Sequence, residues 1–270
     1  MDVEQIRNRY RYSYILLKQL VKTDFKLRYQ GSVLGYAWSL LRPLLLFVIL
    51  YFVFVRMLKF GNKIEHFPVY LLLGIVIWNF FQEMTTRSLT SIVERGDLLR
   101  KLRIPRWVII LSSSISALIN LLLNMVVVVL LMMLNHVDLL KTSLLLPLIL
   151  LEVYIFALGL SLFLSAAYIK FRDVSYIWEV ILQAAFYLTP IIYPLTLISN
   201  VTYQKLMLLN PMAQAIQDAR YAAVSHKATA GFQLYSDNLI AFIPFAIVIV
   251  VFIGGFTYFK SQAKFFAEEI

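Results

Sequence analysis

The sequence contains no cysteine, which excludes a disulfide framework and a thiolate metal site. Charged residues are also scarce: they make up 15% of the 270 residues, against 61% hydrophobic residues, and the mean hydropathy is +0.77. Soluble domains carry about 25% charged residues, so this chain has too little charge to cover a water-facing surface. We therefore expect an integral membrane protein of the all-α class, and the same composition excludes a disordered or low-complexity chain.

Motifs of the common enzyme classes are missing as well. The chain has no Gly-x-x-x-x-Gly-Lys-Ser/Thr loop that would cradle ATP phosphates. Its three histidines, His66, His136 and His226, all fall near expected outer loops and lack the spacing of metal ligands. We expect no catalytic residue, no metal site and no cofactor on this chain.

Six apolar segments are candidates to cross a bilayer core of about 30 Å, which needs about 20 residues per helix. They are residues 36–55, 67–82, 107–135, 144–169, 174–197 and 238–259. The fifth segment is interrupted by Pro190 and Pro194, which each remove a backbone donor and kink or break a helix. No signal peptide is expected, because the first long apolar run begins only at residue 36 and no cleavage site follows a short core.

The net charge of +10 is distributed unevenly between the loops. With the N-terminus inside, the inner segments hold 17 of the 25 Lys and Arg residues, and the outer segments hold 7. Lys and Arg collect on the cytoplasmic side of membrane proteins. We therefore expect a multi-pass protein of the plasma membrane with both termini in the cytosol, and no nucleic-acid partner.

The N-terminal segment, residues 1–35, has the pattern of an amphipathic helix lying in the membrane plane. One face carries apolar side chains at helical spacing, namely Tyr10, Tyr14, Leu17, Val21 and Phe25. Basic residues follow its other edge, namely Arg11, Lys18, Lys22 and Lys26. Lysines in this position reach lipid phosphates, but the same pattern fits a helix packed on a partner protein.

Two segments between the expected spans depart from a simple loop. Residues 87–106 mix apolar residues with charges of both signs around Gly96, which favours a docking surface for another protein over a solvated loop. Residues 189–237 are unusually apolar for an outer segment, and Asn210 followed by Pro211 predicts a helix start there. This second segment would either re-enter the membrane or lie flat on the outer leaflet.

One carboxylate, Glu152, lies well inside an expected span. Ionisable groups at this depth are functional candidates, as in an ion-coupled transporter. The other interpretation is that Glu152 pairs with a hydroxyl group or with Arg42.

Five motifs together resemble the permease subunits of type-2 ABC exporters for cell-surface polysaccharide and teichoic acid. The main one runs from Lys22 to Pro43 and contains the pattern Arg-Tyr-x-Gly-Ser-x-Leu-Gly-x-x-Trp. The others follow in the family's order: Arg95–Lys101, Phe171–Asp173, Thr189–Pro194 and Leu209–Pro211. The likeness covers essentially the whole chain, and exporters of rhamnose-rich polysaccharide from Gram-positive bacteria resemble it most. Arg42 departs from the pattern, since the family often has Asn there; it would anchor the helix end or attract the diphosphate of a lipid carrier.

The resemblance implies a fold of six transmembrane helices over residues 36–259, with a cytosolic coupling helix at about 87–106, a re-entrant segment at about 189–237 and a cytosolic tail at 260–270. It also implies two copies of the chain, each docked on an ABC ATPase subunit that binds ATP and Mg. The substrate would be a glycan linked to undecaprenyl diphosphate.

Site residues follow from the same resemblance. The coupling residues would be Ile92, Glu94, Arg95, Gly96, Asp97, Leu98, Leu99 and Arg100. The interfacial helix would meet membrane lipids through Lys18, Lys22, Lys26 and Arg28. Sugars stack on flat rings, so the substrate path would be lined by Trp38, Arg42, Tyr51, Phe52, Phe186, Tyr187 and Tyr193.

Three other functions remain as alternatives. An ion-coupled secondary transporter predicts internal repeats and several midplane ionisable groups, and neither is visible. A membrane enzyme acting on lipid-linked sugars predicts clustered carboxylates or histidines, which are also missing. An exporter of a drug or another lipid would share the family's fold, and only the glycan-type motif at Lys22–Pro43 argues against it.

Overall fold

The computed structural model describes residues 3–28, 32, 34–35, 37–57, 64–101, 105–138, 141–235 and 238–263, and within the first helix it describes side chains from residue 11 onward except 25, 27 and 28. These parts are helical and contain no β-strand. The long helices are α1 (Val3–Arg28), α2 (Ala37–Tyr51, continued by a π-helical turn to Met57), α3 (Phe67–Glu94), α5 (Arg106–Leu134), α6 (Leu146–Lys170), α7 (Val174–Leu188) and α12 (Ile243–Gln262). The short ones are α4 (Gly96–Lys101), α8 (Val201–Leu208), α9 (Pro211–Ala223), α10 (Gly231–Leu234) and α11 (Asn238–Ala241).

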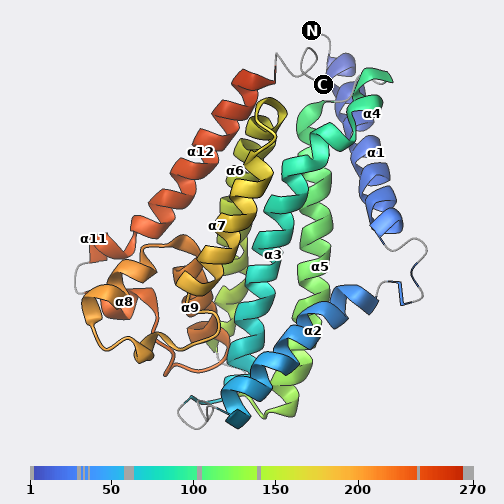
Figure 1. Cartoon of the computed structure of the whole chain (residues 1–270). Helices are drawn as coiled ribbons and strands as arrows, with labels where there is room; N and C mark the ends of the chain where they lie inside the picture. The colour runs from blue at the N-terminus through green and yellow to red at the C-terminus, as the bar shows by residue number, and fades with distance from the viewer. Residues whose placement is uncertain are drawn as a thin grey trace.

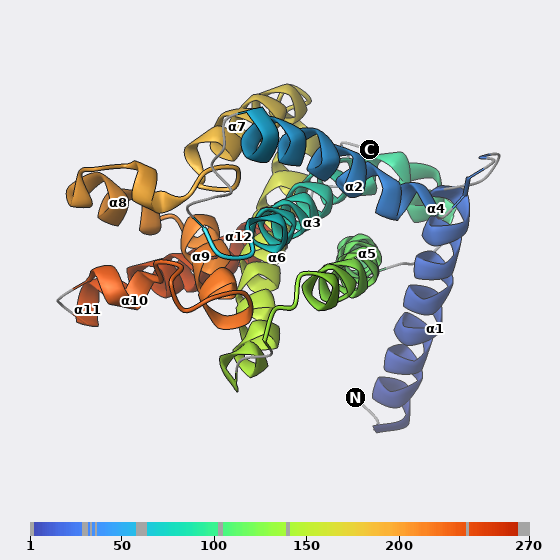
Figure 2. The same ribbon diagram turned by 90° about the horizontal axis from the view of Figure 1, so that it is seen from below.

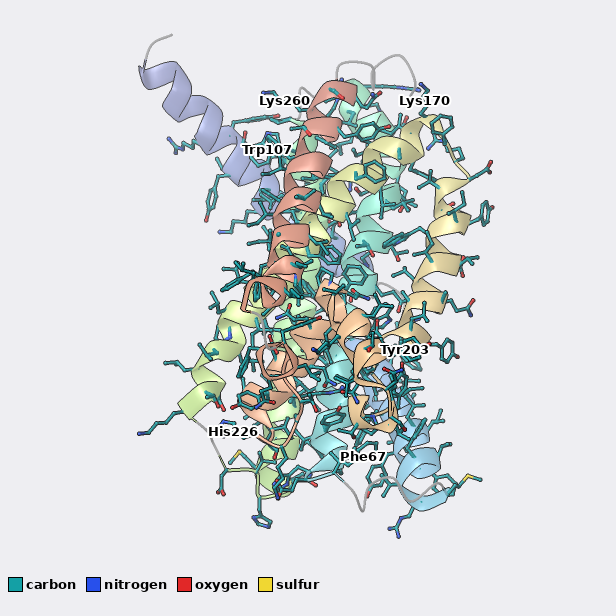
Figure 3. The ribbon with its side chains drawn as sticks, turned by 90° about the vertical axis from the view of Figure 1, so that its left-hand side faces the viewer. Phe67, Trp107, Lys170, Tyr203, His226 and Lys260 are labelled. Atoms are coloured by element: carbon teal, nitrogen blue, oxygen red, sulfur yellow. The ribbon has the colours of Figure 1, made fainter. Side chains whose placement is uncertain are left out.

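Helices α3, α5, α6, α7 and α12 run roughly along one axis, and α2 crosses them obliquely (Figure 1). The start of α1 and the end of α12 lie at one end of this bundle, which we call the termini end. Lys170 and Lys260 lie at the same end, whereas Phe67 and His226 lie at the opposite end, called the loop end (Figure 3). Both ends of the described chain therefore lie on one side.

Helix α3 forms the centre of the bundle, surrounded by α2, α5, α6, α7 and α9 (Figure 2). Its most apolar stretch is 78% buried, against 33% or less in the other long apolar helices. The other helices therefore expose apolar side chains such as Val48, Leu130 and Val250, each more than half exposed. In a membrane protein these faces contact lipid or another subunit.

Within the described residues, five helical segments are long and apolar enough to cross a membrane. The expected fifth span is different, because α7 has only 15 residues and ends at Leu188 rather than near residue 197. Thr189 adopts an extended conformation (φ −88°, ψ 134°). The ring of a proline pushes the preceding residue out of the helical region. Pro190 therefore keeps Thr189 out of the helix, and α7 ends at Leu188.

The second span is longer than expected, since α3 continues through residues 83–94 to the termini end. The expected coupling helix at 87–106 is correspondingly reduced to the six residues of α4. The helical period of residues 83–94 places Ser88, Ser91 and Ile92 on a buried face, and this burial stabilises the extension.

Helices α6 and α12 pack closely against each other. Gly159 faces Gly255, and a Cβ atom added at Gly159 would lie 2.6 Å from the Cα atom of Phe252. Small residues let helix backbones approach closely in membranes, where packing rather than the hydrophobic effect holds helices together. Gly254, the neighbouring glycine, has open space around the equivalent position.

The substitution Gly255→Ala should therefore destabilise the protein, while Gly254→Ala should not. A Cβ at residue 255 would overlap the backbone of Gly159, and overpacking of this kind costs about 1–3 kcal/mol. Thermal unfolding of the two purified variants in the same detergent measures the difference. Equal midpoints for the two variants would contradict the contact.

Candidate functional site

The expected coupling residues separate into an exposed and a buried set. Glu94, Asp97 and Arg100 are exposed at the termini end. Leu98 and Leu99 pack against an apolar cluster that joins α1, α3, α5, α6 and α12. Ile92 and Gly96 are buried within the molecule. The exposed set is available to a partner protein, and Leu98 and Leu99 are partly accessible beside it.

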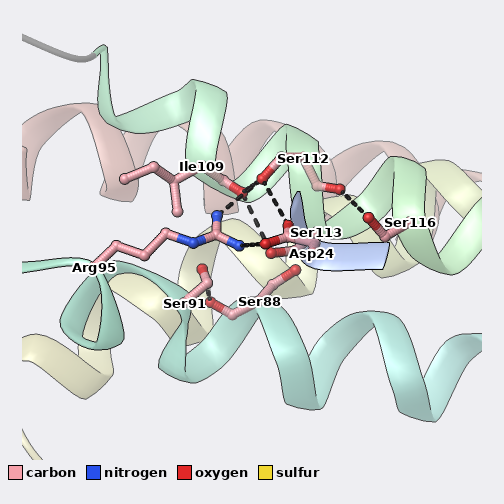
Figure 4. Close-up of polar contacts among 8 residues, drawn as sticks. All are labelled: Asp24, Ser88, Ser91, Arg95, Ile109, Ser112, Ser113 and Ser116. Carbon is pink, nitrogen blue, oxygen red and sulfur yellow. Dashed lines mark hydrogen bonds and ion pairs between the residues drawn. The ribbon is translucent and has the colours of Figure 1, made fainter. Parts of the chain in front are cut away.

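Arg95, which we expected on the docking surface, instead points inward to an ion pair with Asp24 (Figure 4). Its guanidinium group also donates a hydrogen bond to the hydroxyl of Ser112 at 2.9 Å. The Ser112 hydroxyl lies 3.4 Å from the second carboxylate oxygen of Asp24. Both charged side chains are less than one-fifth exposed, and hydrogen bonds between charged groups are stronger than neutral ones. The cluster, named the Asp24–Arg95 cluster below, joins α1 to the junction of α3 and α4 and to α5.

Helix α1 packs on α5 of its own chain, with Ser13 and Leu20 buried and Asp24 in the cluster just described. Tyr14 belongs to the apolar face that we expected to meet lipid or a partner protein, and it is 67% exposed rather than packed on α5. Apolar periodicity does not report the polar contacts of Asp24. Lys18, Lys22 and Lys26 are exposed, and the side chain of Arg28 lies outside the described side chains.

The expected substrate-path residues fall into separate groups. Trp38 and Arg42 line a cavity between α2, α3 and α5. Phe186 and Tyr187 form an edge-on pair at the end of α7, and Tyr193 donates a hydrogen bond to the Tyr187 carbonyl at 3.0 Å. The remaining two, Tyr51 and Phe52, lie at the far end of α2; Tyr51 contacts Phe47, and Phe52 is 59% exposed.

Arg220 is fully buried and holds the broken end of α7, a role that the sequence analysis missed. Its guanidinium group donates to the carbonyl oxygens of Pro190 and Ile191, each at 2.6 Å, and to that of Tyr70 at 3.0 Å. The chain after Thr189 is no longer helical, so the Pro190 and Ile191 carbonyls lack helical partners. In a membrane every backbone polar group must be satisfied within the protein, and Arg220 satisfies these two.

Three further features of the surroundings accommodate this buried cation. The guanidinium carbon lies 3.6 Å from the centroid of the Tyr70 ring, which is attractive because the ring face is electronegative. Gln217 accepts a hydrogen bond from Arg220 at 3.3 Å and another from the Tyr70 hydroxyl at 3.3 Å. Gly74 leaves space on α3, since a Cβ there would lie 2.5 Å from the guanidinium. The arrangement ties α3, α7 and α9 together.

Helix α9 begins as the sequence predicts. The Asn210 side chain accepts a hydrogen bond from the backbone N–H of Met212 at 3.0 Å, and Pro211 occupies the first turn. Eleven of its thirteen residues are buried, polar Gln214 and Gln217 among them. An isolated helix on the outer leaflet would bury only one face, so α9 is part of the protein core.

Glu152 does not pair with Arg42, which lies in a different part of the bundle. Glu152 instead interacts with Gln214 and Asp218 of α9. Asp218 is itself held by the Gln214 amide and by the backbone N–H of Gly231 at 3.0 Å. Glu152 therefore belongs to the contact between α6 and α9. Among the described residues, no group of three or more His, Asp or Glu side chains could hold a metal ion.

At the loop end, the turn before α3 is fastened to the loop after α9. Lys227 forms an ion pair with Glu65 at 2.5 Å, and the Ser225 hydroxyl donates to the same carboxylate at 2.8 Å. These two bonds, Lys227 first, hold the pKa of Glu65 below its ordinary value. Both charged side chains are largely exposed, so the pair contributes little to stability.

Comparison of the amino-acid sequence with known proteins finds relatives over most of the chain. The model of the ABC-2 type transporter family matches residues 15–223. The O-antigen export system permease protein RfbA of Myxococcus xanthus is 29% identical over 272 residues, covering 99% of this chain and all of the relative. Two proteins of the same name from Klebsiella pneumoniae are 31% and 30% identical and cover 78% and 76% of this chain and 82% and 78% of their own lengths.

Replacing Asp24 by Asn should loosen α1 from the bundle, because the substitution leaves the Arg95 cation without its carboxylate. We expect a loss of about 1–3 kcal/mol in stability. The exchanged pair Asp24→Arg with Arg95→Asp should recover part of it. Thermal unfolding in detergent measures these changes, with Lys22→Gln on the exposed face of α1 as control. If Asp24→Asn behaves like Lys22→Gln, the cluster does not hold the helix.

Replacing Arg220 by Met should leave the carbonyls of Pro190 and Ile191 buried without donors, which costs about 2 kcal/mol or more. Arg172→Met is the matched control, because Arg172 is exposed and its side chain lies over the Tyr168 ring rather than on a buried carbonyl. A thermal midpoint for Arg220→Met close to that of the control would show that these hydrogen bonds do not stabilise the broken helix.

Proposed function

The chain belongs to the ABC-2 type transporter family, and we propose that it is the permease subunit of an exporter for a lipid-linked cell-surface polysaccharide. The observation that carries the proposal is the match to relatives whose names specify O-antigen export, over 99% of this chain in one case and 78% in another. A permease subunit is non-catalytic, so the ATP and Mg would be bound by a separate ATPase subunit. The family also favours this function over an ion-coupled transporter.

The substrate would be a glycan on undecaprenyl diphosphate, moved from the cytosolic to the outer face of the cytoplasmic membrane. The names of the relatives favour an O-antigen-type polysaccharide over teichoic acid or a rhamnose-rich polymer. The exposed aromatic residues Trp38, Phe52 and Tyr187 support a path that binds sugars through flat rings. An exporter of a drug or another lipid is the remaining alternative.

In the proposed topology, residues 36–259 form six membrane crossings with both termini in the cytosol. Five crossings correspond to the long apolar helices, and the sixth combines the short α7 with the core segment after Pro190. Exposed basic residues of α1 and α4 and Lys260 of α12 lie towards the termini end, which supports a cytosolic location for that end. Helix α9 and its neighbours in 189–237 would re-enter the membrane from outside.

Two chains would pair, and each would dock on one ATPase subunit through the termini end. Glu94, Asp97 and Arg100 are exposed at intervals of three residues in and beside α4, which supports a docking surface of mixed charge. The lysines of α1 would meet lipid phosphates. The Asp24–Arg95 cluster joins α1 to this turn, so a movement of α1 or of the turn would be transmitted to the other.

The test is co-purification of the tagged chain with the ABC ATPase encoded beside it. We expect a complex with two copies of each subunit. Reversing the exposed charges with Asp97→Arg and Arg100→Glu should reduce the co-purified ATPase about tenfold, since like charges across an interface cost several kcal/mol. Lys205→Glu, at the opposite end of the chain's fold in α8, should leave the complex unchanged. A chain that purifies without any ATPase would contradict the proposed function.

A further inference from the structure

Two carboxylates approach each other where α9 packs on α6. Glu152 belongs to α6 and Asp218 to α9, and the side chain of Gln214 interacts with both. Gln214 is 2% exposed, and the two acidic residues are partly buried. Two carboxylates that share one site repel each other when both are ionised. The contact therefore needs a positive charge beside it or a proton on one of the two groups.

The pair lies in the half of the bundle nearer the loop end. Helix α6 ends with Lys170 at the termini end, so its first residue, Leu146, lies at the loop end (Figure 3). Glu152 follows six residues later, which corresponds to about 9 Å along the helix. In a bilayer core about 30 Å thick, this depth lies within the hydrocarbon region, where an ionised side chain is costly.

Two N–H donors of this contact go to Asp218 and leave other oxygens without a partner. One Asp218 oxygen accepts the backbone N–H of Gly231 at 3.0 Å, and the other accepts the Gln214 amide. The Oε1 atom of Glu152 and the amide oxygen of Gln214 are both buried without a hydrogen-bond partner in the part of the chain that the structure describes. Buried polar atoms are normally hydrogen-bonded, and two acceptors cannot bond to each other. One hydrogen atom is missing from the contact.

No basic side chain within the described residues neutralises the pair. The charge that acts on Glu152 there is that of Asp218. Arg220, the cation of α9, faces carbonyl groups of α3 and of the broken end of α7. Helix α12 carries no charged residue from 243 to 259. The titratable groups on the surrounding elements are engaged elsewhere or exposed: Tyr70 lies under Arg220, Tyr154 contacts Ser114, Tyr221 stacks on His226, Tyr235 donates to the Lys205 carbonyl, Tyr258 contacts Phe163, and Lys141 and Glu179 are exposed.

We propose that the contact between α6 and α9 binds one proton, held as the carboxylic acid of Glu152 beside an ionised Asp218. The proton turns the unpartnered Glu152 oxygen into a donor, and the open amide oxygen of Gln214 is its acceptor. Asp218 keeps its charge because it accepts two N–H donors, which favour the ionised form of a carboxyl group. One proton thus supplies the missing hydrogen bond and removes the second negative charge.

The proton makes the packing of α9 on α6 sensitive to alkaline pH. In the unfolded chain a glutamate loses its proton at about pH 4, so at neutral pH the folded state binds one proton more than the unfolded state. The free energy of unfolding then decreases as the pH rises, because loss of the proton places two negative charges across the contact. The proton site does not depend on the proposed function.

The test is thermal unfolding of the full-length permease in one detergent at neutral and at alkaline pH. The unaltered protein should lose about 3–5 °C in its midpoint at alkaline pH. Glu152→Gln keeps the shape and the donor of the protonated acid, so it should keep the neutral-pH midpoint and lose most of this decrease. Glu179→Gln is the matched control, because it removes an exposed carboxylate of α7 and should behave like the unaltered protein.

The corresponding change at Asp218 should have the opposite effect. Asp218→Asn turns one acceptor into a donor that faces the N–H groups of Gly231 and Gln214. Its midpoint should therefore fall by about 3 °C or more already at neutral pH. Comparison of the two amide variants shows which of the two carboxyl groups holds the proton.

Infrared spectroscopy detects the proton directly through the carbonyl stretch of a carboxylic acid. This band should be present in the unaltered protein at neutral pH, disappear at alkaline pH and be missing in Glu152→Gln. The pH titration of the unaltered protein alone decides the question if that variant does not fold.

Three results would overturn the proton site. One is a spectrum without a carboxylic-acid band at neutral pH. Another is an alkaline decrease of the midpoint that is equal in Glu152→Gln and Glu179→Gln. The third is a midpoint that Na⁺ or Ca²⁺ raises at fixed pH in the unaltered protein but not in Glu152→Gln, which would assign the contact to a metal cation.

Discussion

The guanidinium group of Arg220 resolves the main conflict between this sequence and a membrane. Pro190 ends α7 after 15 residues, and a broken helix in lipid must have its freed carbonyls satisfied within the protein. Arg220 supplies hydrogen bonds to the Pro190 and Ile191 carbonyls, while Gly74 and Tyr70 of α3 provide the space and the ring face. These hydrogen bonds of Arg220 connect the buried helix α9 to the central helix α3. The geometry of the proposed outer half of the path depends on the same hydrogen bonds.

A second polar cluster performs the equivalent task at the termini end. The Asp24–Arg95 cluster joins α1 and the α3–α4 junction to Ser112 of α5 (Figure 4). Polar side chains continue down the same buried face of α5 through Ser116 to Asn120 and Asn124, which line the cavity. The Asp24–Arg95 cluster and the cavity between α2, α3 and α5 therefore share one helix, α5.

Sequence patterns predict the parts of this molecule that depend on neighbouring residues. The all-α class, the start of α9 at Asn210 and Pro211, and the interruption at Pro190 follow from composition, capping and proline chemistry, and all are confirmed. The expected second span ended at residue 82, whereas α3 continues to Glu94 because Ser88, Ser91 and Ile92 are buried. The contact of α1 with α5 through Asp24 was not predicted. Asp24 and Arg95 lie 71 residues apart and Arg220 lies 30 residues from Pro190, so no local pattern reports either contact. In the sequence, Arg220 is one charged residue within an outer segment that is otherwise largely uncharged, and nothing nearby indicates that it is buried.

Transport itself tests the central claim most directly. Inverted membrane vesicles from cells that make the lipid-linked polysaccharide expose the glycan on their outer, cytosolic face, where a specific antibody measures it. With the permease and its ATPase both present, addition of ATP should move the glycan into the lumen and remove the antibody signal, and omission of either subunit should abolish this loss. A glycan that stays accessible in the presence of both subunits and ATP, or one that disappears equally without the permease, would contradict the account.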